Sequence, residues 1–252
     1  MIESILLTTT QISTFDMDRA LSHATGFFFE RDDRLYLVTS RHVLFDKPSR
    51  HFPSRIEIEF HTDPDDLTGF AVLSIPLYRL GECVWHQGRD AAGEVDVAVI
   101  ELDRAAVHED ALFVCFTPSH LELAMGEIEV GMALLLVGYP LGFQDNRHHL
   151  PVVRQAMIAS SFGVRFQGQG YFLTDARTHR GASGAPVVMH DDSANDLPLP
   201  WKLLGVHSAR MDMGPRDMQL DETLGLNCAW YADILLSMTT EVLVVSGHKE
   251  AP

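Results

Sequence analysis

Apolar and polar residues alternate with a period of two along much of this chain, which is the pattern of half-buried β-strands. The clearest cases are residues 24–30 (ATGFFFE), 34–40 (RLYLVTS) and 55–60 (RIEIEF). The first two segments flank a short polar turn and predict a β-hairpin. Further apolar runs predict additional strands at 96–102, 133–140, 152–164, 170–175, 185–189 and 202–209.

Helical periodicity is confined to the two ends of the chain. Residues 15–24 (FDMDRALSHA) predict a short helix, and residues 229–243 (AWYADILLSMTTEVL) have the 3.6-residue apolar spacing of a helix packed on the body of the protein. Residues 104–128 have no clear strand period and are the candidate connection between two β halves. Short strands punctuated by Gly, Pro, Asn and Asp favour an all-β barrel or sandwich.

Composition and charge limit the classes of molecule that this protein is expected to bind. The 252 residues are 46% hydrophobic, which is enough to bury a full core. A net charge of −16, with no Lys/Arg cluster, argues against binding a nucleic-acid backbone. No apolar run is long enough to span a bilayer, so no membrane partner is expected. No metal-ligand spacing appears, even around the adjacent His148 and His149, so we predict neither a metal nor another cofactor.

The predicted location is the cytoplasm. The N-terminal residues have neither a basic region nor a continuous apolar segment, so no signal peptide is expected. The three cysteines, Cys83, Cys115 and Cys228, are odd in number and far apart, which fits a reducing compartment better than a disulfide framework.

Candidate chemistry centres on residues 180–186 (RGASGAP), where Ser183 lies in a glycine-rich turn. A serine hydroxyl becomes a nucleophile only with a base in reach, an acid that orients the base, and donors for the oxyanion. His42 follows an apolar strand and Asp96 begins another, and strand edges can project side chains into a cleft. The chain order His42, Asp96, Ser183 is that of the chymotrypsin arrangement.

The glycines beside Ser183 fit the same interpretation. Gly181 permits a sharp turn that aims the amides of Gly181 and Ser183 at one point, and Gly184 removes bulk behind the nucleophile. Each element has a plainer explanation on its own, since a Gly-x-Ser-Gly segment is often only a turn and His42 alone is compatible with a core histidine. Their combination in this order favours a catalytic site.

Longer segments resemble the trypsin-like serine proteases, and among them the bacterial HtrA-type branch. Residues 173–187 (LTDARTHRGASGAPV) are similar to the Thr-Asp-Ala and Gly-x-Ser-Gly region of that branch. The similarity extends to 131–143 (GMALLLVGYPLGF), 203–209 (LLGVHSA) and 224–235 (LGLNCAWYADIL), so it covers roughly residues 24 to 240. Few residues follow the predicted last helix, so we expect no PDZ module of the kind that many HtrA proteins append.

The resemblance implies an all-β fold of two perpendicular six-stranded antiparallel β-barrels with a C-terminal helix. Residues 1–252 would form one trypsin-like peptidase domain, with an N-terminal barrel at about 20–105, a connection at about 106–126 and a C-terminal barrel and helix at about 127–245.

The resemblance also implies roles for particular residues. His42 and Asp96 would come from the first barrel and Ser183 from the second. Ser208 would hydrogen-bond Asp96, and residues Ser208 to Arg210 would pair with a substrate strand.

A substrate preference is predicted from the residues around Ser183. Thr178 and His207 resemble the pair that binds a Glu or Gln before the cut in glutamyl endopeptidases and viral chymotrypsin-like cysteine proteases. An imidazole and a hydroxyl can each donate a hydrogen bond to a carboxylate or amide oxygen. Arg177 either adds positive charge at the pocket base or turns outward into solvent. We therefore predict cleavage after Glu or Gln.

The predicted function is that of a serine endopeptidase acting on protein or peptide substrates through an acyl-enzyme. The alternative is a protease fold that is used as a peptide-binding module, for instance by strand addition. A third state, implied by the resemblance to the HtrA branch, is a latent enzyme in which loops 142–149 and 177–181 are misplaced until a partner or substrate orders them. The sequence carries no signal for an oligomeric state.

Overall fold

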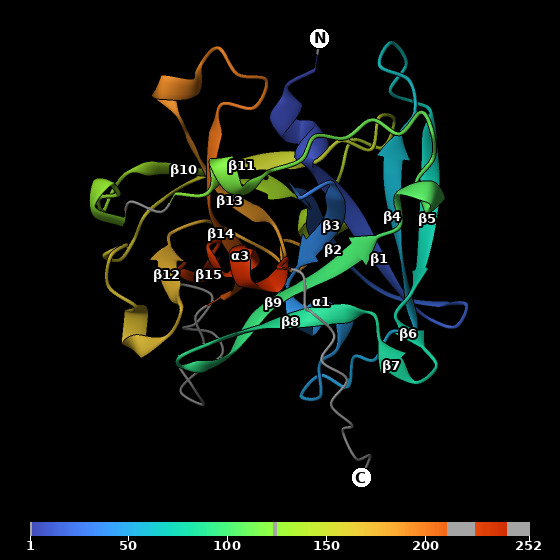
Figure 1. Cartoon of the computed structure of the whole chain (residues 1–252), viewed down its shortest axis with the longest axis horizontal. Coiled ribbons are helices and arrows are strands. Elements are labelled where there is room, and N and C mark those ends of the chain that lie inside the picture. Colours follow the sequence, from blue (N-terminus) through green and yellow to red (C-terminus); the bar gives the residue numbers. More distant parts are fainter. Residues whose placement is uncertain (1, 123–124, 211–224, 241–252) are drawn as a thin grey trace.

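Two antiparallel sheets form the body of the protein, whose computed structural model describes residues 2–122, 125–210 and 225–240 (Figure 1). The first sheet has the strand order β5-β4-β1-β2-β3-β9-β8. Its strands are β1 (Thr9–Asp16), β2 (Arg19–Arg31), β3 (Arg34–Thr39), β4 (Arg55–His61), β5 (Phe70–Pro76), β8 (Trp85–Asp90) and β9 (Gly93–Leu102). The short strands β6 (Tyr78–Arg79) and β7 (Glu82–Cys83) pair only with each other.

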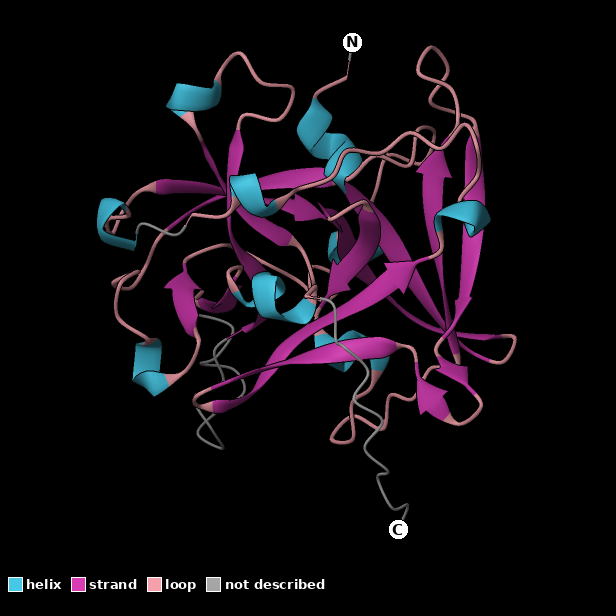
Figure 2. Ribbon diagram, in the orientation of Figure 1, coloured by secondary structure: helices cyan, strands magenta, loops and turns pink. Residues whose placement is uncertain are grey.

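The second sheet has the order β11-β10-β13-β14-β15-β12. Its strands are β10 (Ala133–Gly138), β11 (Val152–Met157), β12 (Tyr171–Thr174), β13 (Pro186–His190), β14 (Trp201–Arg210) and β15 (Asn227–Tyr231). The α-helices are α1 (Arg41–Leu44) and α3 (Ile234–Met238), and the 3-10 turns are η1 (Ser4–Thr8), η2 (Arg104–Ala106), η3 (Pro118–His120), η4 (Met125–Glu127), η5 (Pro140–Gly142), η6 (Phe166–Gly168) and η7 (Asp192–Ala194). Figure 2 shows how small the helical share is, and the predicted all-β class is confirmed.

The segment between the sheets docks against both of them. It contains 3-10 turns and no named strand in its described part, as its lack of period predicts. The backbone of Phe116 bonds the first sheet, donating to the carbonyl of Phe28 and accepting from the amide of Glu30. Leu121 forms a bridge to Leu203 of β14 in the second sheet. One apolar cluster therefore runs through both sheets and includes side chains of β2, β9, β10, β13 and β14.

The predicted helix at 15–24 was wrong, and two other predictions differ from the structure in detail. Residues 15–24 form the end of β1, a turn and the start of β2, because the backbone there pairs as an antiparallel hairpin with Asp16 opposite Arg19. The first sheet has seven strands rather than six. The predicted C-terminal helix starts only at Ile234, because the preceding residues pair as β15 with both β12 and β14. Residues 241–243 of that prediction lie outside the described residues.

We predict that Phe116→Ala lowers the free energy of unfolding by about 3–5 kcal/mol, the usual cost of truncating a buried phenylalanine. Phe116 is fully buried and packs edge-on against Phe27, with ring centroids 5.7 Å apart. Phe143→Ala is the matched control, because Phe143 is 66% exposed, and it should change stability by at most about 0.5 kcal/mol. Equal effects in urea unfolding would contradict the docking of the connection into the shared core.

Candidate active site

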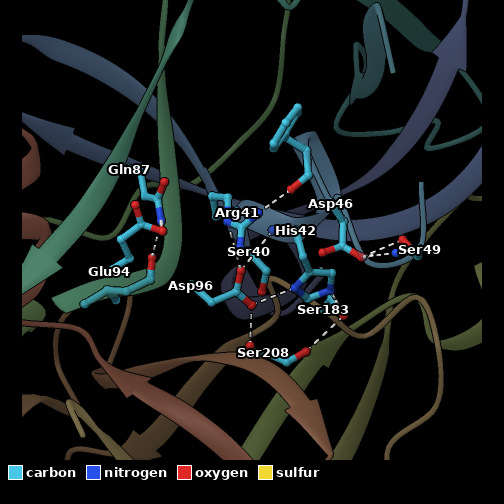
Figure 3. A network of polar contacts seen from close by, with 12 residues as sticks. Ser40, Arg41, His42, Asp46, Ser49, Gln87, Glu94, Asp96, Ser183 and Ser208 are labelled. Atoms are coloured by element: carbon cyan, nitrogen blue, oxygen red, sulfur yellow. Dashed lines mark hydrogen bonds and ion pairs between the residues drawn. The ribbon is translucent and has the colours of Figure 1, made fainter. Parts of the chain in front are cut away.

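His42 and Asp96 come from neighbouring elements at the first sheet. β3 pairs with β9, and α1, which contains His42, follows β3 after one residue, so His42 lies beside the strand that carries Asp96. The two residues are joined twice: the amide of His42 donates to Oδ1 of Asp96 at 2.9 Å, and Nδ1 lies 2.6 Å from Oδ2. The two bonds fix both the position and the ring orientation of the imidazole (Figure 3).

Ser183 comes from the second sheet, on the loop between β12 and β13. Its Oγ lies 2.9 Å from Nε2 of His42 and 3.0 Å from the carbonyl oxygen of Ser208. Because Asp96 can only accept while it is ionised, Nδ1 of His42 carries the proton, which leaves a lone pair on Nε2. The one hydroxyl proton of Ser183 therefore has two acceptors, and one of them is an imidazole nitrogen, the kind of group that can act as a base toward a serine.

Asp96 stays ionised although only 20% of its side chain is exposed. Burial alone would raise the pKa of this carboxyl, but the hydrogen bonds from His42 and from the hydroxyl of Ser208 outweigh burial and hold the pKa below its usual value. The guanidinium of Arg41 adds an ion pair, with Nε 3.9 Å from Oδ1. Ser208 thus lies in the contact with Asp96 that the family resemblance implied (Figure 3).

The turn around Ser183 depends on two glycines. Gly184 has a φ of +87°, and a Cβ there would lie 2.1 Å from the carbonyl oxygen of Thr25. Gly181 has a φ of +90°, and its Cβ would lie 2.5 Å from the carbonyl oxygen of Tyr139. Both positions therefore need glycine for backbone conformation as well as for space.

Two amides of this turn are free to donate. Within the described residues, the amides of Gly181 and Ser183 have no acceptor. The carbonyl of Arg180 accepts from the amide of Leu141 at 2.5 Å. A trans peptide directs its C=O and N–H to opposite sides, so the N–H of Gly181 points away from Leu141. Two free donors beside a serine hydroxyl that contacts an imidazole are what an oxyanion hole needs.

A cavity of about 310 Å³ lies next to this turn, and Arg180 is one of the residues that line it. Arg177 and Arg180 are exposed, and neither guanidinium group has a hydrogen bond or ion pair with another described residue. The wall of the cavity is thus cationic, although the protein as a whole is strongly acidic. The lining residues are Leu141, Ala176, Arg177, Thr178, His179, Arg180, Gly225 and Asn227.

Thr178 and His207 are not positioned to donate the predicted hydrogen bonds to a substrate Glu or Gln. Thr178 lines the cavity, but its hydroxyl donates to Oδ1 of Asn227 at 2.6 Å, so its single proton is already used. His207 is 2% exposed and is not among the lining residues. Burial, with a smaller contribution from His42, lowers the pKa of His207 to about 4, so the ring is neutral at pH 7 and its Nδ1 has no partner.

The structure describes one further predicted site residue, Arg210, only in part. Arg210 ends β14 opposite Asn227, and its side chain lies outside the described part of the chain. Asn227 was missed by the sequence analysis. It is fully buried, and its Nδ2 also donates to the carbonyl of Ala176. The sequence signal that could have identified Asn227 is a polar residue inside an otherwise apolar strand segment.

The described residues include no group of three or more His, Cys, Asp or Glu side chains arranged to hold a metal ion. The helices in those same ranges are all too short or too polar to cross a membrane. Cys83, Cys115 and Cys228 form no disulfide with one another. Burial raises the pKa of Cys115 to about 12 and that of Cys228 to about 11, so both remain protonated at neutral pH.

Comparison with known families decides the affiliation. Residues 24–194 match the trypsin-like peptidase domain. This chain belongs to the trypsin-like peptidase family. The sequence-based resemblance to trypsin-like proteases is therefore confirmed. A comparison with curated protein sequences gave no match.

Solved structures of trypsin-like peptidases have the same fold. An HtrA-type protease, AlgW, in a variant form with a tripeptide, matches with a TM-score of 0.52 and 18% identity over 92% of this chain and 58% of that one. A serine endoprotease from Yersinia pestis matches with a TM-score of 0.52 and 16% identity over 93% of this chain and 62% of its own. This chain thus spans about three-fifths of the length of each, and the likeness at these identities is one of fold.

We predict that His207 makes the protein less stable in acid. The pKa of this group is about 4 when folded and about 6.5 when exposed, so between these values the unfolded chain binds a proton that the folded chain does not. The free energy of unfolding therefore falls as the pH falls from 6.5 to 4, by roughly 3 kcal/mol over the interval. In urea unfolding, His207→Gln should lose this part of the pH dependence. An unchanged pH dependence in the variant would contradict the neutral, buried state.

Proposed function

We propose that this trypsin-like peptidase is a serine endopeptidase, with Ser183 as nucleophile, His42 as general base and Asp96 as the group that orients the base. The observation that carries the proposal is the continuous chain of contacts from Asp96 through His42 to Ser183, at 2.6 Å and 2.9 Å. Its three members come from two sheets and are separated by up to 141 residues, so local chain geometry does not account for their meeting.

The chemistry follows from these contacts. Nε2 of His42 takes the hydroxyl proton as Oγ of Ser183 bonds to the carbonyl carbon of the substrate, and the ionised Asp96 stabilises the imidazolium that results. Collapse of the tetrahedral intermediate breaks the C–N bond, and His42 returns the proton to the leaving amine. Water then attacks the acyl-enzyme by the same route, and the acid product leaves with Ser183 restored.

The free amides of Gly181 and Ser183 would stabilise the oxyanion of both tetrahedral intermediates. Losing one such donor typically costs about 10²–10³ in kcat. With these amides unpaired and His42 in contact with Ser183, the geometry favours an assembled site over the latent enzyme or the peptide-binding module.

The substrate preference that we propose is Glu or Gln before the scissile bond. The guanidinium groups of Arg177 and Arg180 line the cavity and can donate to a carboxylate or an amide oxygen. Thr178 already donates to Asn227, so toward a substrate it can only accept, for example from the NH₂ group of a Gln. In this arrangement Arg177 and Arg180, rather than the neutral His207, provide the donors.

We predict that Ser183→Ala abolishes hydrolysis of unfolded protein substrates and that Asp96→Asn lowers kcat by about 10³–10⁴-fold, because the imidazole loses the required tautomer. Ser193→Ala is the matched control, since Ser193 lies on an exposed loop and bonds only Asp191 there. Turnover of a fluorogenic casein measures all three. Full activity in Ser183→Ala would contradict the proposed nucleophile.

We predict that Arg177→Gln lowers kcat/KM for a peptide with Glu before the cut by about tenfold or more, because a charge-assisted hydrogen bond is lost. A matched peptide with Gln should lose less. Arg89→Gln is the control, since Arg89 pairs with Glu94 at the surface and does not line the cavity. A wild-type preference for small aliphatic or basic residues in a peptide library would overturn the proposed specificity.

A further inference from the structure

Thr25 connects the first sheet to the turn that carries Ser183. It lies on β2 and is fully buried. Its hydroxyl donates to the carbonyl of Gly181 at 2.8 Å, and its own amide donates to the carbonyl of Ser183 at 3.0 Å. One residue of the first sheet thus holds the two residues whose amides would bind the oxyanion.

The same hydroxyl also supports this turn from the other side. Oγ1 of Thr25 accepts from the amide of Tyr139 at 3.0 Å, and Tyr139 opens the short turn in which the amide of Leu141 binds the carbonyl of Arg180. Thr25 therefore restrains both peptides that flank Gly181: directly through the carbonyl of Gly181, and indirectly through the carbonyl of Arg180.

Gly181 needs such restraint because a glycine has access to more backbone conformations than any other residue. The direction of its N–H is set by the Arg180 peptide, so rotation of that peptide would turn the donor away from the cleft. The buried hydrogen bond from the hydroxyl of Thr25 to the carbonyl of Gly181 limits this rotation. Because the bond is buried, solvent does not offer the carbonyl another donor.

The fit around Thr25 is close on both sides. A Cβ on Gly138 would lie 2.6 Å from Oγ1 of Thr25, and a Cβ on Gly184 would lie 2.1 Å from its carbonyl oxygen. That carbonyl also accepts from the hydroxyl of Thr39 at 2.8 Å. The hydroxyl thus lies against the backbone of Gly138, and its removal leaves the carbonyl of Gly181 without a partner among the described residues.

We propose that Thr25 is a positioning residue for the oxyanion hole, which holds the peptide of Gly181 so that its amide faces the developing negative charge. The inference rests on the proposed endopeptidase function and deepens it. Thr25 does not touch substrate. Its effect should therefore appear in the transition state, with substrate binding unchanged.

The test compares Thr25→Val, which removes the hydroxyl at nearly constant shape, with Thr25→Ser, which retains it. Thr25→Val should lower kcat for a peptide substrate by about 10- to 100-fold, with KM changed by less than about threefold, since one oxyanion donor is worth about 10²–10³ and would be displaced rather than deleted. Thr25→Ser should stay within about threefold of wild type. The pH at which kcat/KM is half-maximal should not move in either variant.

Thr14→Val is the matched control, because Thr14 is equally buried in the first sheet and its hydroxyl bonds Ser22 away from the cleft. It should lose stability without losing kcat. The affinity for a peptide boronate tests the same effect at equilibrium. Thr25→Val should weaken boronate binding by the same factor by which it lowers kcat/KM. Thr25→Ala provides the comparison if the valine variant does not fold.

The outcomes separate this inference from the proposed function. Full kcat in Thr25→Val, an equal loss in Thr25→Ser, or an equal loss in Thr14→Val would each overturn the role of Thr25 while leaving the endopeptidase intact. A wild-type protein that cleaves no peptide and binds no boronate would overturn both.

Discussion

The ionised carboxylate of Asp96 is the constraint on which the rest of the site depends. Burial opposes its charge, and hydrogen bonds from His42 and Ser208 keep its pKa low. Because the charge persists, the proton of the imidazole stays on Nδ1 and Nε2 remains free to accept from Ser183. A neutral Asp96 would remove that preference, so the electrostatics of one side chain set the chemistry of the other two.

The second constraint is the close approach of the two sheets at the cleft. Ser183 comes from one sheet and His42 from the other, so the site exists only where these sheets meet. Glycines at positions 138 and 184 allow the approach, because a Cβ at either would collide with Thr25. A backbone hydrogen bond from the amide of Thr25 to the carbonyl of Ser183 then joins the two sheets. The shared apolar core supports this contact from behind.

Local pattern predicted much of the fold, and the remainder depended on contacts between distant residues. Strands 24–30 and 34–40 were visible from their period, and the turn between them holds Asp32 and Asp33 at positive φ. β1 was missed because its polar-rich residues 9–16 become buried only through pairing with β2 and β4. For the site, glycine and chain order pointed to His42, Asp96 and Ser183. The bonds of Thr178 to Asn227 and of Thr25 to Gly181 span 49 and 156 residues, so no local signal reveals them.

The most direct test of the account is the reaction of the purified protein with a fluorophosphonate, followed by mass mapping of the adduct. This reagent needs an activated serine and free oxyanion donors, but no knowledge of the substrate. The account predicts one adduct per chain, on Ser183, formed rapidly in wild type and at least about a hundredfold more slowly in His42→Ala. No adduct, or an adduct that persists in Ser183→Ala at the wild-type rate, would contradict the claim that Ser183 is the nucleophile.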